Sequence, residues 1–242
     1  MAQRGFHEPG EKPRRFYKAV EVRAADGRFE VALDGRAPRS TGGAKLILPT
    51  QALAELCAEE WAAQGEHIEL GVMHATRLAY TAIEAIPGAR EATADQIAEY
   101  AGSDLLCYFA EAPASLVERQ AEHWGPVLDR AEQEIALAFV RAAGIRHRSQ
   151  PEETLAQVKA LALEGGDFAL AGLAFATPLF GSAILALALQ RGWLTGDQAM
   201  ELSRLDEAYQ QEKWGIDEEA AERTARLFVE AQMLERWFRA LG

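Results

Sequence analysis

The sequence has little cysteine. Cys57 and Cys107 are the only two, and they do not form a C-x-x-C pair. Small secreted domains usually carry a dense set of disulfides, and structural zinc sites usually use paired cysteines. The cysteine content therefore excludes a disulfide framework and a cysteine-based zinc site. It is typical of a protein that works in a reducing compartment.

Recognisable catalytic and cofactor motifs are also missing. The chain contains no G-x-G-x-x-G, no phosphate-binding P-loop and no G-x-S-x-G. Its histidines show neither H-x-x-x-H nor H-E-x-x-H spacing, so no metal site is predicted, and we interpret them as structural or solvated; they are His7, His67, His74, His123 and His147. From the residues we expect no cofactor, no metal and no enzymatic activity.

Basic residues are outnumbered. The chain has 25 Lys and Arg against 37 Asp and Glu, a formal net charge of −12. Such a charge argues against non-specific binding to nucleic acid and favours solubility or a basic partner. The charge is uneven, because residues 1–50 carry ten basic and six acidic groups, giving +4, and the rest carries −16. This asymmetry indicates two regions with different surfaces.

Neither a secretory signal nor a membrane span is expected. The first residues lack an apolar core, so residues 1–13 are interpreted as a short disordered leader. The stretch Phe168–Gln190 has no charged residue. However, Thr177 and Pro178 interrupt it in the order of an N-cap and a first helical residue. We expect two buried helices that meet at Pro178, rather than a bilayer span.

The N-terminal part has the pattern of a small β meander. Across residues 16–48, two strand-like runs are joined by Asp26-Gly27, a strong hairpin signal. Phe29, Val31 and Leu33 alternate with other residues, so one face of their strand is expected to be buried. A third short apolar run follows Gly42-Gly43. We predict three or four antiparallel strands.

The remainder of the chain has helical patterns. Thr50 is placed to cap the first helix, and a second helix is expected to stop before Pro87-Gly88. Further helices are predicted over residues 91–102, 114–142, 152–164, 167–176, 179–191, 196–214 and 217–240. The fold class is therefore α+β, with a small antiparallel β-rich N-terminal domain, residues 1–86, followed by a larger α-helical domain, residues 87–242.

The predicted helix from Thr195 to Gly215 is the most informative. Thr195 and Gln198 have the spacing of a capping box, and Gly215 suits a helix end. Leu202, Leu205 and Tyr209 recur at helical spacing and are expected to face the core.

The opposite face of this helix is a candidate binding surface. Glu207 lies almost opposite the apolar stripe, with Arg204, Gln211 and Trp214 on the same side. A tryptophan beside a carboxylate on a polar face is unusual, since large aromatic side chains are normally buried or used for contact. A partner-binding surface is one interpretation. The alternative is that a second helix or domain covers this face.

One cluster in the sequence suggests an enzyme instead. Ser103, Asp104 and Cys107 lie close together, and His123 could act as a base. Simpler interpretations exist: Ser103 and Asp104 precede an apolar run as capping or turn residues, and Cys107 lies between apolar neighbours as a buried thiol. A nucleophile would need a base within hydrogen-bonding distance. We keep an enzyme of unrecognised type as the alternative function.

Three stretches together resemble one known family. They are RRFYKAVEV (residues 14–22), YAGSDLLCYFA (residues 100–110) and LSRLDEAYQQEKWGIDEEA (residues 202–220). In combination they are similar to the assembly chaperones that act on the alpha subunit of the F1 part of ATP synthase, found in mitochondria and alphaproteobacteria. The resemblance covers the chain from about Arg14 onward. Phe109 departs from the pattern, since a basic residue often follows the tyrosine there.

The resemblance implies a non-catalytic protein. It would bind the free alpha subunit, keep it soluble and release it to the beta subunit. The family's important acidic position corresponds to Glu207, with Asp206 adjacent. We therefore expect partner binding through Glu207, Asp206, Arg204, Gln211 and Trp214.

The expected setting follows from the same resemblance. We expect a monomer in the bacterial cytoplasm, or in the mitochondrial matrix if the source is eukaryotic. The remaining alternative is a structural subunit that stays in its final complex.

Overall fold

The computed structural model describes residues 12–144, 146–215 and 218–242. A small antiparallel sheet is followed by a mostly helical region, so the predicted α+β class is confirmed. The chain divides into two compact units, Met1–Arg77 and Leu78–Gly242. The domains predicted from the sequence, with a boundary at residues 86–87, stay a prediction. Most of the expected leader, residues 1–11, lies outside the described residues, whereas the carbonyl of Pro13 accepts a hydrogen bond from Ile68 N at 2.8 Å.

The first unit contains the predicted hairpin. Strands β1 (Val20–Ala25) and β2 (Arg28–Leu33) pair antiparallel around the Asp26-Gly27 turn, and β3 (Ile47–Leu48) adds to the other side of β2. Both turn residues have positive φ, 48° and 76°, as the tight hairpin turns of two residues require. Along β2 the side chains become buried toward Leu33, while Phe29 stays partly exposed.

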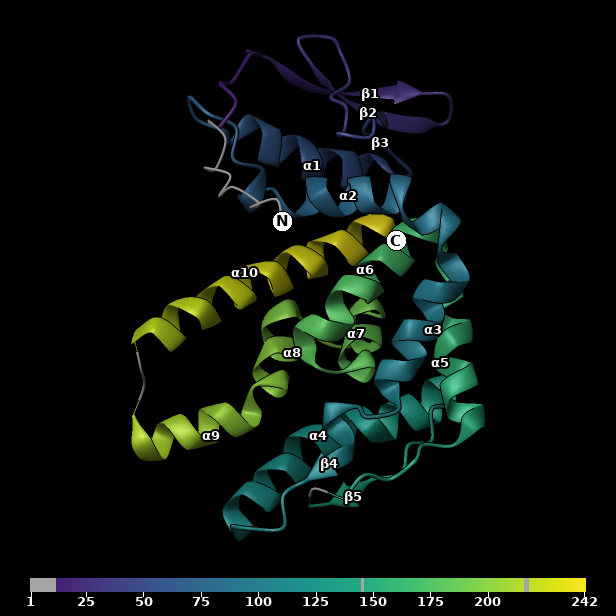
Figure 1. Cartoon of the computed structure of the whole chain (residues 1–242), viewed down its shortest axis with the longest axis vertical. Coiled ribbons are helices and arrows are strands. Elements are labelled where there is room, and N and C mark those ends of the chain that lie inside the picture. Colours follow the sequence, from purple (N-terminus) through teal and green to yellow (C-terminus); the bar gives the residue numbers. More distant parts are fainter. Residues whose placement is uncertain (1–11, 145, 216–217) are drawn as a thin grey trace, which may run out of the picture. The chain divides into compact units, whose positions relative to one another are not determined.

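Helix α1 (Gln51–Ala62) covers this sheet (Figure 1). Its predicted N-cap is confirmed, because the Thr50 hydroxyl accepts a hydrogen bond from Leu53 N at 3.1 Å. The 3-10 turn η1 (Leu70–Val72) leads to α2 (His74–Glu84). The carboxylate of Glu60 in α1 accepts hydrogen bonds from Ala75 N and Thr76 N, both at 2.8 Å, and so satisfies free amides at the start of α2.

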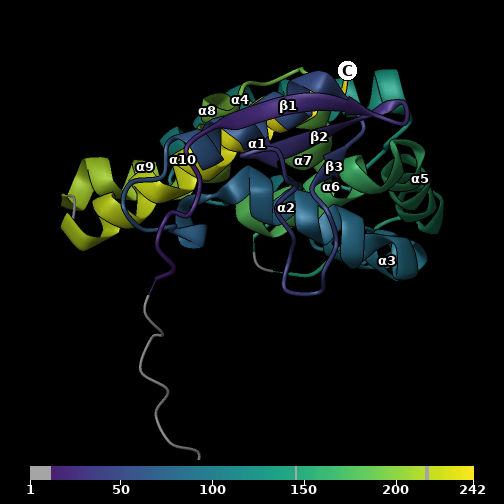
Figure 2. The same cartoon turned by 90° about the horizontal axis from the view of Figure 1, so that it is seen from above.

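The second unit is built from helices. In chain order its elements are η2 (Ile86–Gly88), α3 (Arg90–Ala101), η3 (Leu105–Cys107), β4 (Tyr108–Phe109), α4 (Ala114–Ile135), β5 (Ala142–Ala143), α5 (Glu152–Glu164), α6 (Gly166–Phe180), α7 (Ala183–Gln190), α8 (Gly196–Ser203), α9 (Leu205–Trp214) and α10 (Glu218–Leu241). Helices α3 and α5 lie side by side in both views (Figures 1 and 2). The C-terminal half of α10 packs on α8 and α6.

Helices α6 and α7 form the centre of this unit. Residues Ala183–Leu189 of α7 are all buried. The predicted junction between the two helices was wrong, because Thr177 and Pro178 lie inside α6. A proline is tolerated in this last turn, and Gly181 ends the helix because it adopts a left-handed conformation, with φ 66°, at little cost. Ser182 caps α7 instead. No helix among the described residues is long and apolar enough to span a membrane.

The helix predicted over residues 114–142 is also shorter than expected. α4 ends at Ile135, because Ala136 adopts a left-handed conformation with φ 55°. The apolar residues that follow are extended, and Ala142 and Ala143 pair in parallel with Tyr108 and Phe109. Pairing with a strand that is distant in the sequence therefore overrides the helical pattern.

A candidate partner-binding surface on helix α9

Helix α8 begins as the sequence predicts. Gln198 N donates to the Thr195 hydroxyl at 3.2 Å, and Thr195 N donates to Gln198 Oε1 at 2.9 Å, which completes the capping box. The prediction of a single helix over residues 196–214 was wrong, however. Arg204, with φ −113° and ψ 19°, separates α8 from α9. Gly215 ends α9 with φ 91° and ψ 170°, a backbone conformation that is essentially restricted to glycine.

The break at Arg204 lets the two short helices pack on different neighbours. α8 is held by α10, where the Glu235 carboxylate accepts a hydrogen bond from Gly196 N at 2.8 Å. α9 contacts α4 instead. At the corner, the Trp124 indole donates to the carbonyl of Leu202 at 3.0 Å. A straight helix could not follow both neighbours.

Three side-chain contacts fasten the inner face of α9 to α4. They are Gln120 Nε2 to Asp206 Oδ1 at 2.7 Å, Ser115 Oγ with the Tyr209 hydroxyl at 2.6 Å, and Arg119 to both carboxylate oxygens of Glu212 at 2.7 and 2.9 Å. The Arg119 guanidinium also lies 5.3 Å from the centre of the Tyr209 ring. Leu205 and Tyr209 are buried, as predicted, whereas Leu202 is only half-buried.

The outer face of α9 is open. Glu207 is exposed, and the Trp214 side chain is 79% exposed. Arg204 and Gln211, on the same side, are half-buried. No helix of the second unit, among its described residues, covers Glu207 or Trp214, and the partner-binding interpretation stays a prediction. A solvent-exposed indole and a solvent-exposed carboxylate on the same helix are available for contact with another molecule.

Asp206 differs from its neighbour Glu207. It is half-buried, and its carboxylate is held by Gln120, which is 1% exposed and also accepts a hydrogen bond from Ala110 N at 2.7 Å. Burial raises the pKa of Asp206, and the Gln120 hydrogen bond opposes this shift. Asp206 therefore supports the position of α9 from the inside.

Sequence reasoning did not identify the residues of α4 that hold α9. Gln120, Arg119 and Ser115 lie about ninety positions before their partners in the chain. Their spacing on α4 shows which face they share, but nothing in one sequence shows which distant helix that face meets. Sequence reasoning could find the outward face of α9 because periodicity alone defines it.

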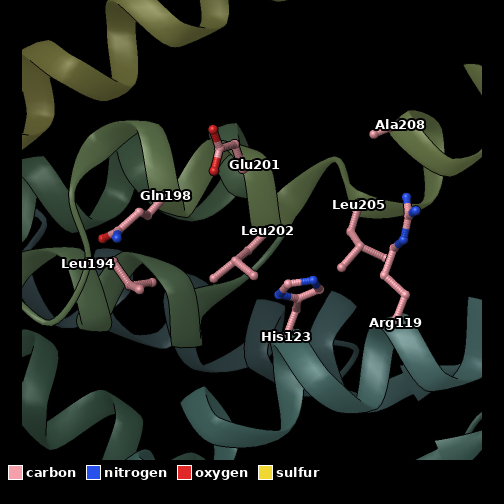
Figure 3. A pocket seen from close by; sticks show the side chains of 8 residues that line it. All are labelled: Arg119, His123, Leu194, Gln198, Glu201, Leu202, Leu205 and Ala208. Carbon is pink, nitrogen blue, oxygen red and sulfur yellow. The ribbon is translucent and has the colours of Figure 1, made fainter. Parts of the chain in front are cut away.

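A pocket of about 500 Å³ lies between α4 and the corner of α8 and α9 (Figure 3). Its lining combines apolar side chains with polar ones: Leu194, Leu202, Leu205, Ala208, Arg119, His123, Gln198 and Glu201. Figure 3 shows Arg119 and His123 extending from α4, with Leu205 pointing toward them and Leu202 between Leu194 and His123. Ala208, from α9, is an exposed lining residue.

The alternative enzyme site is not assembled. Of Ser103, Asp104, Cys107 and His123, only His123 lines this pocket. Cys107 is buried, and burial raises the pKa of its thiol, which leaves it a poor nucleophile at neutral pH. Among the described residues, no group of three or more His, Cys, Asp or Glu side chains could hold a metal ion.

Asp104 has a structural role. It is fully buried, its Oδ1 accepts hydrogen bonds from the Ser182 hydroxyl at 2.6 Å and Leu106 N at 3.1 Å, and its Oδ2 accepts one from Ile184 N at 3.1 Å. Burial raises the pKa of Asp104 to about 6, and these hydrogen bonds oppose the shift. The carboxylate caps both η3 and α7, so the capping interpretation of this residue is confirmed.

Comparison with known proteins gives a consistent result. A family model described as "ATP12 chaperone protein" matches residues 14–132. Atp12 from Paracoccus denitrificans has a crystal structure with a TM-score of 0.88 and 37% identity, covering 95% of this chain and 99% of that one. The Atu1473 protein of Agrobacterium tumefaciens gives a TM-score of 0.90 and 40% identity, covering 95% and 87%. The mitochondrial protein atp12 of Schizosaccharomyces pombe is 25% identical over 221 residues, 86% of this chain and 76% of that protein.

Proposed function

Because the chain belongs to the ATP12 chaperone family, which serves ATP synthase assembly, we propose that it binds the unassembled alpha subunit of the F1 part. It covers the exposed interface of that subunit and hands it on to the beta subunit. The observation that carries this proposal beyond the family assignment is the open face of α9, where Glu207 and Trp214 are both exposed on a helix that α4 holds through Gln120 and Asp206.

The physical reason for such a chaperone is the apolar surface of a free subunit. An unassembled subunit exposes area that its neighbour normally covers, and this area drives aggregation. A chaperone must bind it strongly enough to prevent misassociation and more weakly than the true neighbour does. The beta subunit then displaces the chaperone from the alpha subunit by competitive binding, and no energy source is needed.

The residues of α9, and Arg204 just before it, have different roles in binding the alpha subunit. Trp214 supplies a large rigid contact surface, and Glu207 supplies a carboxylate for a basic or amide group of the partner. Arg204 and Gln211 contribute polar contacts on the same side. Asp206 borders this surface and holds the helix that presents it, through its bond to Gln120. A fixed helix loses little conformational freedom on binding, which favours affinity.

The proposal includes a non-enzymatic role. Chaperone membership supports it, and the only pocket residue shared with the alternative enzyme site is His123. We propose that the protein acts as a monomer, in the bacterial cytoplasm or, in a eukaryote, in the mitochondrial matrix.

Co-expression with the alpha subunit of the source organism tests this function. We expect the soluble fraction of alpha to rise, and alpha to co-purify with the tagged chain. Addition of purified beta subunit should then release alpha from the chaperone. The proposal is contradicted if alpha aggregates equally with and without the chain. Stoichiometric co-purification of the chain with mature ATP synthase would instead identify a permanent subunit.

A further inference from the structure

The pocket beside α9 offers apolar surface that the folded chain leaves partly uncovered. Leu194 and Leu202 are half-buried, Leu205 forms the floor, and Ala208 is exposed at the rim. Leucine side chains in a folded monomer are usually buried more completely. Partly exposed leucines gathered in one concave site indicate a surface that is completed by another molecule.

The polar groups at the pocket rim do not suit a charged metabolite. Arg119 is the one lining residue with a permanent positive charge, and it is already engaged by both carboxylate oxygens of Glu212. Gln198, Glu201 and His123 are exposed around the mouth. Together they offer hydrogen-bond donors and acceptors of the kinds that the N–H and C=O groups of a peptide backbone require.

The charge of Glu201 at the pocket mouth indicates which kind of peptide segment binds there. Glu201 is exposed at the mouth and makes no ion pair with any other residue that the structure describes. The chain after residue 50 carries a formal charge of −16. An exposed carboxylate, Glu201, beside apolar lining residues is complementary to a segment in which a bulky apolar side chain stands next to Lys or Arg.

The pocket is continuous with the proposed binding face. Ala208 is a lining residue of the pocket and is exposed. Ala208 lies one turn after Arg204, so a segment that contacts Arg204 reaches the pocket mouth. We propose that the pocket binds a bulky apolar side chain, flanked by a basic residue, from an extended segment of the unassembled alpha subunit. This inference rests on the proposed function and adds its anchoring site.

A substitution that fills the pocket tests this inference. Ala208→Trp adds a large side chain at an exposed helix position, where it occupies the pocket without changing the core. Ala92→Trp, at an exposed position of α3 outside the pocket, is the matched control. We expect Ala208→Trp to weaken binding of purified alpha subunit by at least about tenfold and Ala92→Trp to leave it unchanged. Urea unfolding of both variants checks that the fold is retained.

Two further measurements do not depend on the folding of that variant. A benzophenone amino acid at Gln198 should crosslink alpha through a segment with an apolar residue beside Lys or Arg, and one at Ala92 should not crosslink. Glu201→Gln should weaken binding several-fold at low salt and reduce its salt dependence.

The outcomes separate this inference from the proposed function. If wild type binds alpha, equal affinity of a folded Ala208→Trp or the absence of a crosslink at Gln198 overturns the pocket assignment alone. If wild type does not bind alpha at all, the proposed function fails and the pocket assignment fails with it.

Discussion

The buried amide of Gln120 in α4 donates a hydrogen bond to the Asp206 carboxylate at the start of α9, with 2.7 Å between Nε2 and Oδ1. Its carbonyl oxygen accepts a hydrogen bond from Ala110 N. Gln120 thus holds both the segment that follows β4 and the helix that carries Glu207. Two adjacent carboxylates therefore have different tasks: Asp206 positions the helix, and Glu207 remains available to a partner.

The first prediction separates these two tasks by stability. Asp206→Ala leaves the buried amide of Gln120 without its acceptor, and should lower the free energy of unfolding by about 1–3 kcal/mol. Glu207→Ala changes an exposed position and should cost less than about 0.5 kcal/mol. Urea unfolding of the two variants and wild type measures both values. Equal losses would show that Asp206 does not hold α9.

A second prediction concerns pH and Asp104. Its pKa of about 6 in the folded protein is above the ordinary value of 3.8, so between about pH 4 and 6 the folded state binds more protons than the unfolded state. Its contribution to stability therefore falls as the pH rises through this range, by up to about 3 kcal/mol.

Asp104→Asn removes this titration and provides the comparison. We expect the difference in unfolding free energy between wild type and Asp104→Asn to decrease from pH 4 to pH 6. Urea unfolding at several pH values measures it. A difference that is constant or increases over this range would show that the pKa of the Asp104 carboxyl is not raised in the folded protein.

Close packing of α8 against α10 gives a third prediction. A Cβ added at Gly196 would overlap the carbonyl of Ala231 and lie 2.8 Å from Gln232 N. These are backbone atoms that cannot move independently, so Gly196→Ala should destabilise the fold by about 1–3 kcal/mol. Gly88→Ala, which meets no atom within 4 Å, is the control and should stay within about 1 kcal/mol of wild type. Thermal unfolding of both variants measures these changes in stability. A Gly196→Ala variant as stable as wild type would contradict this packing of α8 on α10.

How far the sequence alone predicts this fold depends on the range of the interactions. The hairpin at Asp26-Gly27, the cap at Thr50 and the capping box at Thr195 were predicted correctly, because each depends on residues within a few positions of one another. The helix ends at Ile135 and Phe180 were not: the apolar pattern continues past Ile135, and Thr177-Pro178 has the local pattern of a helix start but lies inside α6.

The candidate site shows the same division. The periodicity of residues 202–214 correctly placed Glu207 and Trp214 on the outside. It did not reveal the break at Arg204 or the pocket, because both arise where α8 and α9 meet helices that are distant in the sequence. For the same reason it did not reveal the hydrogen bond from Gln120 to Asp206.

The exposed indole gives a fourth prediction. Trp214→Ala should weaken binding of the alpha subunit by about 2 kcal/mol, because a tryptophan in an interface is often one of its main energetic contacts. Tyr100→Ala, an exposed aromatic residue of α3, is the control and should bind like wild type. Wild-type tryptophan fluorescence should also shift to shorter wavelength when alpha binds, and Trp214→Phe should lose most of this shift. An unchanged affinity of Trp214→Ala would exclude the indole from the interface.

The affinity of Glu207→Ala for purified alpha subunit, measured by calorimetric titration, tests the central claim most directly. Glu99→Ala, which removes an exposed carboxylate from α3, serves as the matched control. We predict that Glu207→Ala loses about 1–3 kcal/mol of binding free energy, because its partner group is left unpaired, while its unfolding midpoint and the affinity of Glu99→Ala stay at the wild-type values. Wild-type affinity in Glu207→Ala would contradict the assignment of this face of α9 as the binding surface.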